Sequence, residues 1–203
     1  MITFTYKSAQ ILSFLYFKLF HRIKIIGIEN IPISGPFILA SNHLSFLDPP
    51  AVGCKVNRNL HYFARSSLFV GPLGFLIRRL NSIPVNRDQL DFKTLKTTLK
   101  VLKDGHPLLV FPEGTRSLDG KISSGKKGIG LLVKKSKCPV FPVRIRGTFE
   151  ILGKGKIFPR IGRKICLSYG KELSYEDLTA SCENGSEIYD LISERVIRAI
   201  KKL

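Results

Sequence analysis

Two short strings of residues, seventy positions apart, contain side chains that could move a proton beside a bound anion. The first string is Asn42-His43-Leu44-Ser45-Phe46-Leu47-Asp48, and the second is Phe111-Pro112-Glu113-Gly114-Thr115-Arg116-Ser117. Histidine can act as a base near neutral pH, a carboxylate can orient it, and arginine binds anionic oxygens in a fork. This set is suited to acyl transfer to an anionic acceptor.

The spacing of His43 and Asp48 excludes a shared helix face. Side chains five residues apart on a continuous α-helix point about 140° away from each other. Pro49 and Pro50 follow directly, and proline favours the first turn of a helix while the residue before it avoids helical backbone. We therefore expect a helix to begin near Pro49, with Asp48 folding back towards His43 on the preceding turn.

A carboxylate bonded to one imidazole nitrogen leaves the other nitrogen available to take a proton from an attacking hydroxyl group. This arrangement is half of a serine-hydrolase triad, with the substrate alcohol in place of the serine. Taken alone, the pattern also fits Asp48 as an ordinary helix N-cap and His43 as a loop residue. Ser45 is not surrounded by a Gly-x-Ser-x-Gly sequence, so we expect it to have a turn or capping role.

The second string follows an apolar stretch, residues 108–111, that is typical of a strand. Gly114 allows the backbone to approach a ligand closely, and Arg116 can fork onto phosphate oxygens. Phosphate binding is the role we expect, although a plain turn with a solvated arginine would contain the same residues. Lys126 and Lys127, near the start of a predicted helix, add a weaker anion-binding signal.

In this order the two strings resemble the first and third blocks of the glycerolipid acyltransferase family, in particular the bacterial 1-acyl-glycerol-3-phosphate acyltransferases. The stretch Ile83-Pro84-Val85-Asn86-Arg87 is similar to the second block, which ends in an acceptor-binding arginine. Val140-Phe141-Pro142-Val143 resembles the fourth block, a strand with a proline. The chain departs from the family before Phe69, where Arg65-Ser66-Ser67 replaces a common Lys-x-Glu pair.

The resemblance implies direct transfer of a fatty acyl group from a thioester to the free hydroxyl of 1-acyl-glycerol-3-phosphate, which gives phosphatidic acid. In that reaction His43 is the general base and Asp48 orients it. The residues that would bind or shape the site of the substrate are Arg87, Glu113, Gly114, Thr115 and Arg116. The co-substrate would be acyl-coenzyme A or acyl carrier protein, and we expect no metal and no cofactor.

Two alternatives stay open. The same chemistry could act on glycerol 3-phosphate, a lyso-ornithine lipid or another lysophospholipid, because the same base and loop would serve. A thioesterase, in which water replaces the alcohol, is also compatible with these residues.

Short apolar runs that alternate with helical patterns predict an α/β layered domain. Strands are expected at residues 23–28, 37–40, 61–64, 83–85, 108–111, 140–145 and 164–168. Most of these runs are continuous rather than alternating, which indicates a sheet covered on both faces. Amphipathic helices are predicted before Gly105 and at the C-terminus. We expect residues 23–203 to form one acyltransferase catalytic domain, with a mixed, largely buried sheet flanked by helices.

Residues 1–22 are rich in apolar side chains but contain Lys7, Gln10 and Lys18. The segment is barely long enough to span a bilayer, so we expect an apolar helix that lies on the membrane rather than a transmembrane anchor or a core helix. A secretory signal peptide is not indicated, because no small-residue cleavage pattern follows.

The chain is strongly basic, with 33 Lys and Arg against 15 Asp and Glu and a formal charge of +18. A charge of this size attracts polyanions. Aromatic side chains interleaved with cations on strands are missing, so an anionic membrane is favoured over nucleic acid. Four cysteines without metal-ligand spacing fit a reducing compartment. We therefore expect a peripheral or monotopic protein at the cytoplasmic face of the cell membrane.

Overall fold

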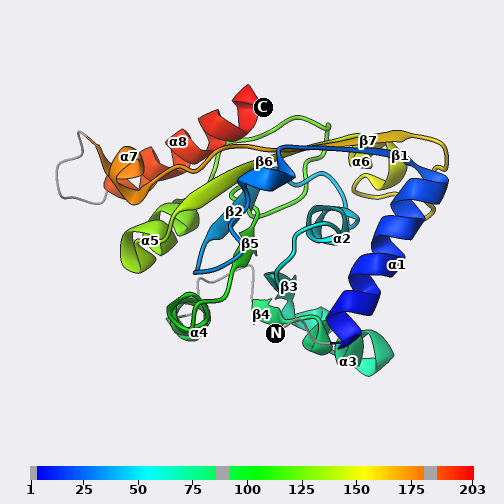
Figure 1. Ribbon diagram of the computed structural model, residues 1–203, viewed down its shortest axis with the longest axis horizontal. Coiled ribbons are helices and arrows are strands. Elements are labelled where there is room, and N and C mark those ends of the chain that lie inside the picture. Colours follow the sequence, from blue (N-terminus) through cyan, green and yellow to red (C-terminus); the bar gives the residue numbers. More distant parts are fainter. Residues whose placement is uncertain (1–3, 86–91, 181–186) are drawn as a thin grey trace.

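The chain folds around one mixed seven-stranded sheet in a computed structural model that describes residues 4–85, 92–180 and 187–203 (Figure 1). The strand order is β1-β7-β6-β2-β5-β3-β4, and each neighbouring pair is parallel except β6 and β7. The strands are β1 (Arg22–Ile26), β2 (Ile38–Ser41), β3 (His61–Arg65), β4 (Ser82–Val85), β5 (Leu108–Val110), β6 (Val140–Arg146) and β7 (Lys164–Tyr169). The prediction of a single α/β domain with a mixed sheet is confirmed.

Helices cover both faces of this sheet. The helices are α1 (Phe4–Phe20), α2 (Asp48–Gly53), α3 (Gly71–Arg79), α4 (Phe92–Lys103), α5 (Lys127–Ser136), α6 (Thr148–Leu152), α7 (Tyr175–Thr179) and α8 (Glu187–Lys202), with short 3-10 turns η1 (Ile28–Asn30) and η2 (Ser66–Leu68). The predicted helix before Gly105 is α4, and Gly105 itself takes a φ of +82°, a conformation that favours glycine.

The central strands are apolar along their whole length because both of their faces are buried. In β2, Ile38 and Ala40 pack with α5 and α8, while Leu39 packs into a second cluster with α2 on the other face. Each of these side chains is 0% exposed. A strand enclosed in this way appears in the sequence as a continuous apolar run, and that run predicted β2.

The parallel pairing of β2 and β5 places the two sequence strings at the same edge of the sheet. Ile38 is opposite Leu108, and Ala40 is opposite Val110. Both strands therefore end side by side, and each string begins where its strand ends. Residues 70 positions apart in the sequence become neighbours through this register.

Helix α1 packs against the domain through one side. Tyr6, Gln10 and Phe17 are buried. The Gln10 Nε2 amide donates to the carbonyl oxygens of Gly53 at 2.9 Å and Val56 at 2.7 Å, and the Tyr6 hydroxyl lies 2.6 Å from that of Tyr62. Across the described residues, no helix has the length and apolar character needed to cross a bilayer. A membrane-facing role for residues 1–22 stays a prediction.

Replacing Gln10 by Leu should reduce stability, because the carbonyl oxygens of Gly53 and Val56 each lose a hydrogen bond, although the Gly53 oxygen keeps the Val56 N–H. Each such loss costs about 1–3 kcal/mol of folding free energy. The measurement is urea denaturation of the variant beside Leu12→Ala, which alters a side chain on the same helix that is 66% exposed. Equal midpoints for the two variants would show that the Gln10 contacts do not hold α1 in place.

Candidate active site

His43 and Asp48 meet on the turn between β2 and α2. The His43 Nδ1 atom lies 2.9 Å from Asp48 Oδ2, and the same oxygen accepts backbone N–H groups from Leu44 at 2.5 Å and Ser45 at 2.7 Å. Asp48 is 0% exposed. It is the first residue of α2, ahead of Pro49, and its side chain folds back onto the turn before the helix.

This geometry differs from an ordinary N-cap, in which a side chain accepts N–H groups of the helix that follows. Asp48 instead accepts N–H groups that precede α2, and α2 has no side-chain cap hydrogen bond. Ser45 has the turn role expected for it, since its hydroxyl donates to the Leu152 carbonyl at 2.7 Å and accepts from the Leu47 N–H.

The imidazole of His43 is held on a second side by Phe111. The two rings are stacked with centroids 3.9 Å apart and an angle of 16° between their planes. An ionised carboxylate only accepts hydrogen bonds, so Nδ1 carries the proton when it bonds to Asp48. The lone pair on Nε2 is then available to a hydroxyl group in the adjoining cavity, which His43 helps to line.

Glu113 joins the two strings. One of its carboxylate oxygens accepts the backbone N–H of His43 at 2.8 Å, and the other accepts from the N–H and hydroxyl of Ser123 at 2.9 and 2.8 Å. The Ser117 N–H donates to the His43 carbonyl at 2.8 Å. Glu113 is buried and shapes the site by holding the backbone of both loops.

The predicted phosphate-binding residues lie beside this junction. Gly114 has a φ of +71°, and a Cβ atom placed there would lie 3.0 Å from the Lys126 side chain, so glycine suits this position. The guanidinium carbon of Arg116 lies 3.6 Å from the centre of the Phe46 ring. Thr115 is exposed. Arg87 lies outside the described residues.

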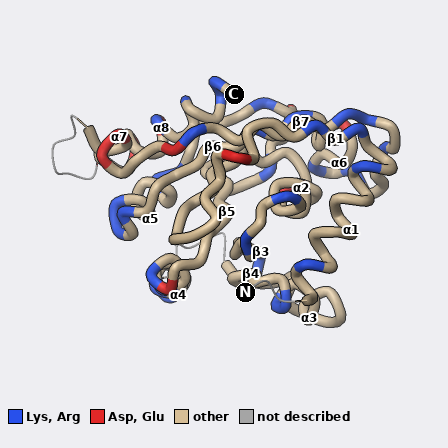
Figure 2. Tube along the Cα trace, in the orientation of Figure 1, with Lys and Arg blue, Asp and Glu red and all other residues tan. Residues whose placement is uncertain are grey.

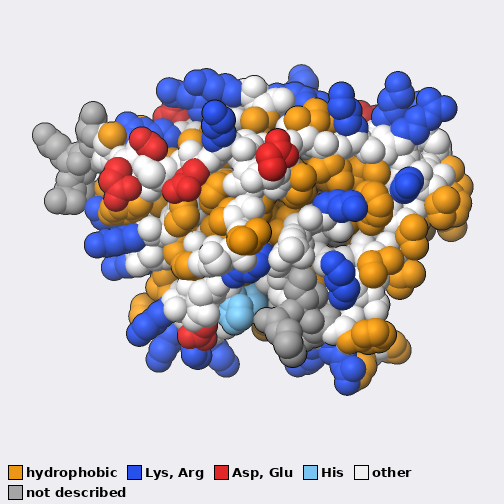
Figure 3. All heavy atoms as spheres, viewed as in Figure 1, with side chains coloured by type: hydrophobic (Ala, Val, Ile, Leu, Met, Phe, Trp, Pro, Cys, Tyr) orange, Lys and Arg blue, Asp and Glu red, His pale blue; other side chains and the backbone are white. Residues whose placement is uncertain are grey.

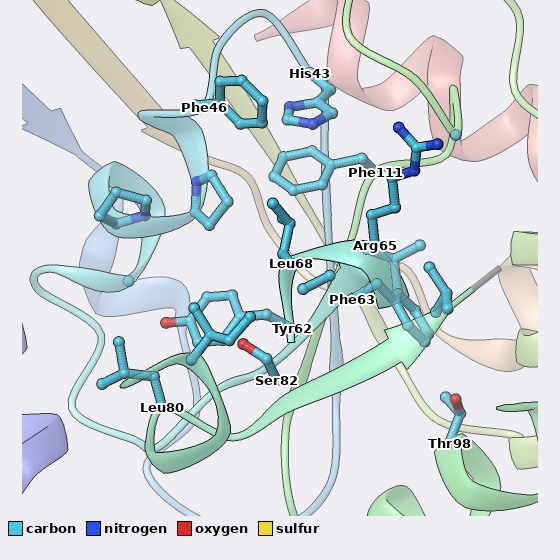
Figure 4. Close-up of a pocket in the computed structure, with 18 of the residues that line it drawn as sticks. His43, Phe46, Tyr62, Phe63, Arg65, Leu68, Leu80, Ser82, Thr98 and Phe111 are labelled. Atoms are coloured by element: carbon cyan, nitrogen blue, oxygen red, sulfur yellow. The ribbon is translucent and has the colours of Figure 1, made fainter. Parts of the chain in front are cut away.

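An apolar cavity of about 840 Å³ opens next to His43. Its walls come from elements across the chain and include Tyr6, Ala9, Phe46, Pro49, Pro50, Tyr62, Ala64, Leu73, Leu76, Leu95, Phe111 and Leu132. Figure 4 shows His43, Phe46 and Phe111 on one side of it and Leu80, Ser82 and Thr98 on another. Arg65, at the position where the chain departs from the family, lies on the His43 side.

Sequence reasoning assigned no role to Asn42, Phe111 or Ser123. The Asn42 side chain donates to the Ile145 carbonyl at 3.0 Å and accepts its N–H at 2.8 Å, so it extends the pairing of β2 with β6 by a side chain. In the sequence, the position of Asn42 directly after an apolar strand and before His43 could have indicated this role. The contacts of Phe111 and Ser123 have no comparable local signal.

A family model described as acyltransferase matches residues 22–146. The chain belongs to the acyltransferase family.

This acyltransferase is similar to proteins from plants and bacteria. It is 34% identical to the chloroplast 1-acyl-sn-glycerol-3-phosphate acyltransferase of Arabidopsis thaliana over 142 residues, which are 67% of this chain and 39% of the relative. It is 28% identical to the 1-acyl-sn-glycerol-3-phosphate acyltransferase of Bacillus subtilis over 148 residues, 70% of this chain and 73% of that protein. The aligned part thus spans about two fifths of the plant relative and most of the Bacillus one.

The crystal structure of the 1-acyl-sn-glycerophosphate acyltransferase PlsC from Thermotoga maritima has the same fold. Its TM-score to this acyltransferase is 0.80 at 29% sequence identity, and the match covers 97% of this chain and 78% of the Thermotoga chain. The likeness therefore extends beyond residues 22–146.

Glu113→Gln should loosen the junction between the two loops of this acyltransferase. The amide replaces one accepting oxygen by an NH2 group, which then faces a backbone N–H, and a buried donor without an acceptor costs about 1–3 kcal/mol. Urea denaturation should show that loss, while Glu150→Gln, at an exposed position on α6, should stay within about 0.5 kcal/mol of the parent. Parent-like stability of Glu113→Gln would contradict this role.

Proposed function

We propose that the chain transfers a fatty acyl group from an acyl thioester to the free hydroxyl of 1-acyl-sn-glycerol-3-phosphate and so forms phosphatidic acid. The observation that carries the proposal is the pairing of His43 with buried Asp48 at the side of an apolar cavity. The plant, Bacillus and Thermotoga relatives, which are named as 1-acyl-sn-glycerol-3-phosphate or 1-acyl-sn-glycerophosphate acyltransferases, support the same activity.

The proposed reaction is a direct transfer in which His43 moves the proton. Nε2 takes the hydroxyl proton of the acceptor, and the acceptor oxygen attacks the thioester carbonyl carbon. The tetrahedral intermediate collapses, the carbon–sulfur bond breaks, and the imidazolium returns its proton to the leaving thiolate. Asp48 holds the ring in the required tautomer and stabilises the imidazolium while it is charged.

The acceptor phosphate is assigned to the loop after β5. Arg116 supplies a planar guanidinium and Gly114 an accessible backbone, with Thr115 beside them. Lys126 adds a second cation, because it lines the cavity together with Gly114. Arg87 remains a predicted phosphate ligand. Glu113 acts through the backbone of His43 rather than on the phosphate.

The cavity is the proposed site of an acyl chain. Its volume lies within the roughly 300–1,000 Å³ typical of small-molecule sites, and most of its lining side chains are apolar. A hydrocarbon chain in this cavity would leave its carbonyl carbon at the end where His43 lies. The proposed donor is acyl-coenzyme A or acyl carrier protein, each of which presents the acyl group as a thioester.

We also propose that the enzyme works on an anionic membrane surface, at the cytoplasmic face, as a peripheral or monotopic protein. Figure 3 shows apolar side chains on the outer side of α1 and near α3. They include Ile11, Leu12, Leu15, Leu19 and Phe20 on α1 and Leu73, Phe75 and Leu76 on α3. A lipid acceptor and its product both reside in a bilayer, and each near-surface cation adds roughly 1 kcal/mol of attraction to anionic lipid.

The activity is tested by thiol release from a long-chain acyl thioester on mixed vesicles, with and without 1-acyl-glycerol-3-phosphate. Release should require the acceptor. His43→Ala and Asp48→Asn should each lower the rate roughly 10²–10⁴-fold, as expected for loss of a general base or of its orientation. His106→Ala, at an exposed histidine before β5, should keep the parent rate.

Each contrary result has a distinct meaning. Release without any acceptor would favour a thioesterase, and release only with glycerol 3-phosphate or a different lysophospholipid would favour that acceptor. Full activity in His43→Ala would contradict the mechanism.

Ser82→Phe should shift the preferred donor to shorter acyl chains. Ser82 lines the cavity away from His43 in Figure 4, so a phenyl ring there would fill space that a long chain needs. The measurement is the rate across a series of acyl thioesters of increasing length. Ser34→Phe, at an exposed position before β2, is the matched control and should leave the profile unchanged. If both variants showed the same dependence of rate on acyl-chain length, the acyl chain would not bind in this cavity.

A further inference from the structure

Residues 154–164, which we call the 154–164 loop, run from the end of α6 to the first residue of β7 and are exposed at every position. Ile157 is 83% exposed, Phe158 81% and Ile161 67%. The loop also carries Lys154, Lys156, Arg160, Arg163 and Lys164 and contains no acidic residue. Large apolar side chains and cations thus alternate within one short segment on the surface.

The apolar side chains point outward from a loop that is held in place. The Lys156 N–H donates to the Gly153 carbonyl at 3.1 Å, and the Arg160 N–H donates to the Ile151 carbonyl at 3.0 Å. The Lys156 ammonium lies over the Phe149 ring, 5.3 Å from its centre. These contacts tie both halves of the loop to α6, so the exposure of the apolar side chains belongs to the fold itself.

The loop is continuous with the apolar side of α1. The Gly162 N–H donates to the Phe20 carbonyl at the end of α1, at 2.9 Å. Leu19 and Phe20, beside this contact, are 74% and 45% exposed. Figure 1 shows α6 and the segment after it beside α1, and Figure 2 shows Lys and Arg gathered around the same end of the molecule.

The loop is also coupled to the active-site turn. The Ser45 hydroxyl donates to the Leu152 carbonyl at 2.7 Å, and Ser45 forms an isolated antiparallel bridge with Gly153. Ser45 in turn donates its N–H to Asp48. A partner bound to the 154–164 loop would therefore lie a few residues from the turn that carries His43.

We propose that the 154–164 loop is a further membrane-contacting element, beside those on α1 and α3, which inserts Ile157, Phe158 and Ile161 into the interfacial region of an anionic bilayer. Its cations then lie at the level of the lipid headgroups. An anionic bilayer fits this segment because it accepts apolar tips and attracts flanking cations at the same time. The proposal rests on the proposed function, since only a membrane-borne acceptor requires the site to be oriented on a bilayer.

Contact through both α1 and the loop would fix the orientation of the enzyme. Because α1 is packed into the domain, a protein held on a membrane through this helix alone could still roll about the helix axis, and a contact away from that axis removes this freedom. The His43 turn, bonded to the base of the loop, is then held at a defined position relative to the lipid headgroups.

The test is co-sedimentation of the full chain with vesicles of phosphatidylglycerol and phosphatidylcholine. The double variant Ile157→Ser, Phe158→Ser should partition about tenfold more weakly, because two apolar side chains no longer enter the interface. Phe92→Ser on α4 is the matched control, since Phe92 is 80% exposed, and its binding should equal that of the parent. All the altered side chains are exposed, so thermal denaturation should show parent-like stability for each variant.

The cations are tested separately. Arg160→Gln with Arg163→Gln should weaken binding to phosphatidylglycerol vesicles roughly fivefold per residue and leave the weaker binding to pure phosphatidylcholine unchanged. An equal loss on both lipids would overturn the role of these arginines.

Parent-like vesicle binding by the Ile157→Ser, Phe158→Ser variant would overturn the proposal. A parent chain that is dimeric in solution and becomes monomeric in this variant, with vesicle binding unchanged, would assign the loop to a second copy of the chain instead.

This readout is independent of turnover. If the parent transfers no acyl group to any acceptor, the proposed function fails, while vesicle binding still decides the role of the loop. If the parent is active, the loop variant should keep its rate on a short-chain acceptor dispersed as monomers and lose rate only on vesicles. An equal loss on the dispersed acceptor would show that the loop acts within the site, which would contradict a membrane-contacting role.

Discussion

The parallel pairing of β2 with β5 is the constraint on which the site depends. Each strand is only a few residues long, and each is enclosed on both faces by apolar side chains. The register follows from packing: alternate side chains of each strand fit two different apolar clusters, and a shift by one residue would exchange them. That register brings the turn carrying His43 against the loop carrying Glu113, and two hydrogen bonds between them lock the junction.

Asn42, Asp48 and Glu113 are buried, and most of their hydrogen bonds go to backbone groups. Asp48 accepts two N–H groups besides the imidazole, Glu113 accepts from His43 and Ser123, and Asn42 pairs with the backbone of Ile145. In a region of low dielectric such contacts are strong, and a missing partner is costly. The imidazole is therefore oriented before any substrate arrives, as an electrostatically organised site requires.

The apolar elements around the site border both the enclosed cavity and an exposed apolar surface. Helix α1 contributes Tyr6 and Ala9 to the cavity wall and leaves its opposite side exposed. The same helix therefore separates the proposed acyl-chain site from the surroundings of the protein. At its end it meets the 154–164 loop, where exposed apolar side chains and cations continue the surface. Helix α1 thus borders the enclosed cavity on one side and carries the exposed apolar surface on the other.

The sequence by itself determined the seven strands, the two amphipathic helices α4 and α8 and the turn between His43 and Asp48. These features depend on local properties: continuous apolar runs, helical periodicity and the backbone limits of Pro49 and Pro50. Resemblance to a family supplied the expected chemistry, and the acyltransferase match agrees with that expectation.

Only the tertiary structure decided the cavity, the stacking of Phe111 on His43, the attachment of α1 through Gln10, and the placement of Glu113 between two backbones. Each of these depends on contacts between segments far apart in the chain. No local pattern encodes such contacts, because they arise from strand order, register and the packing of helices on the sheet.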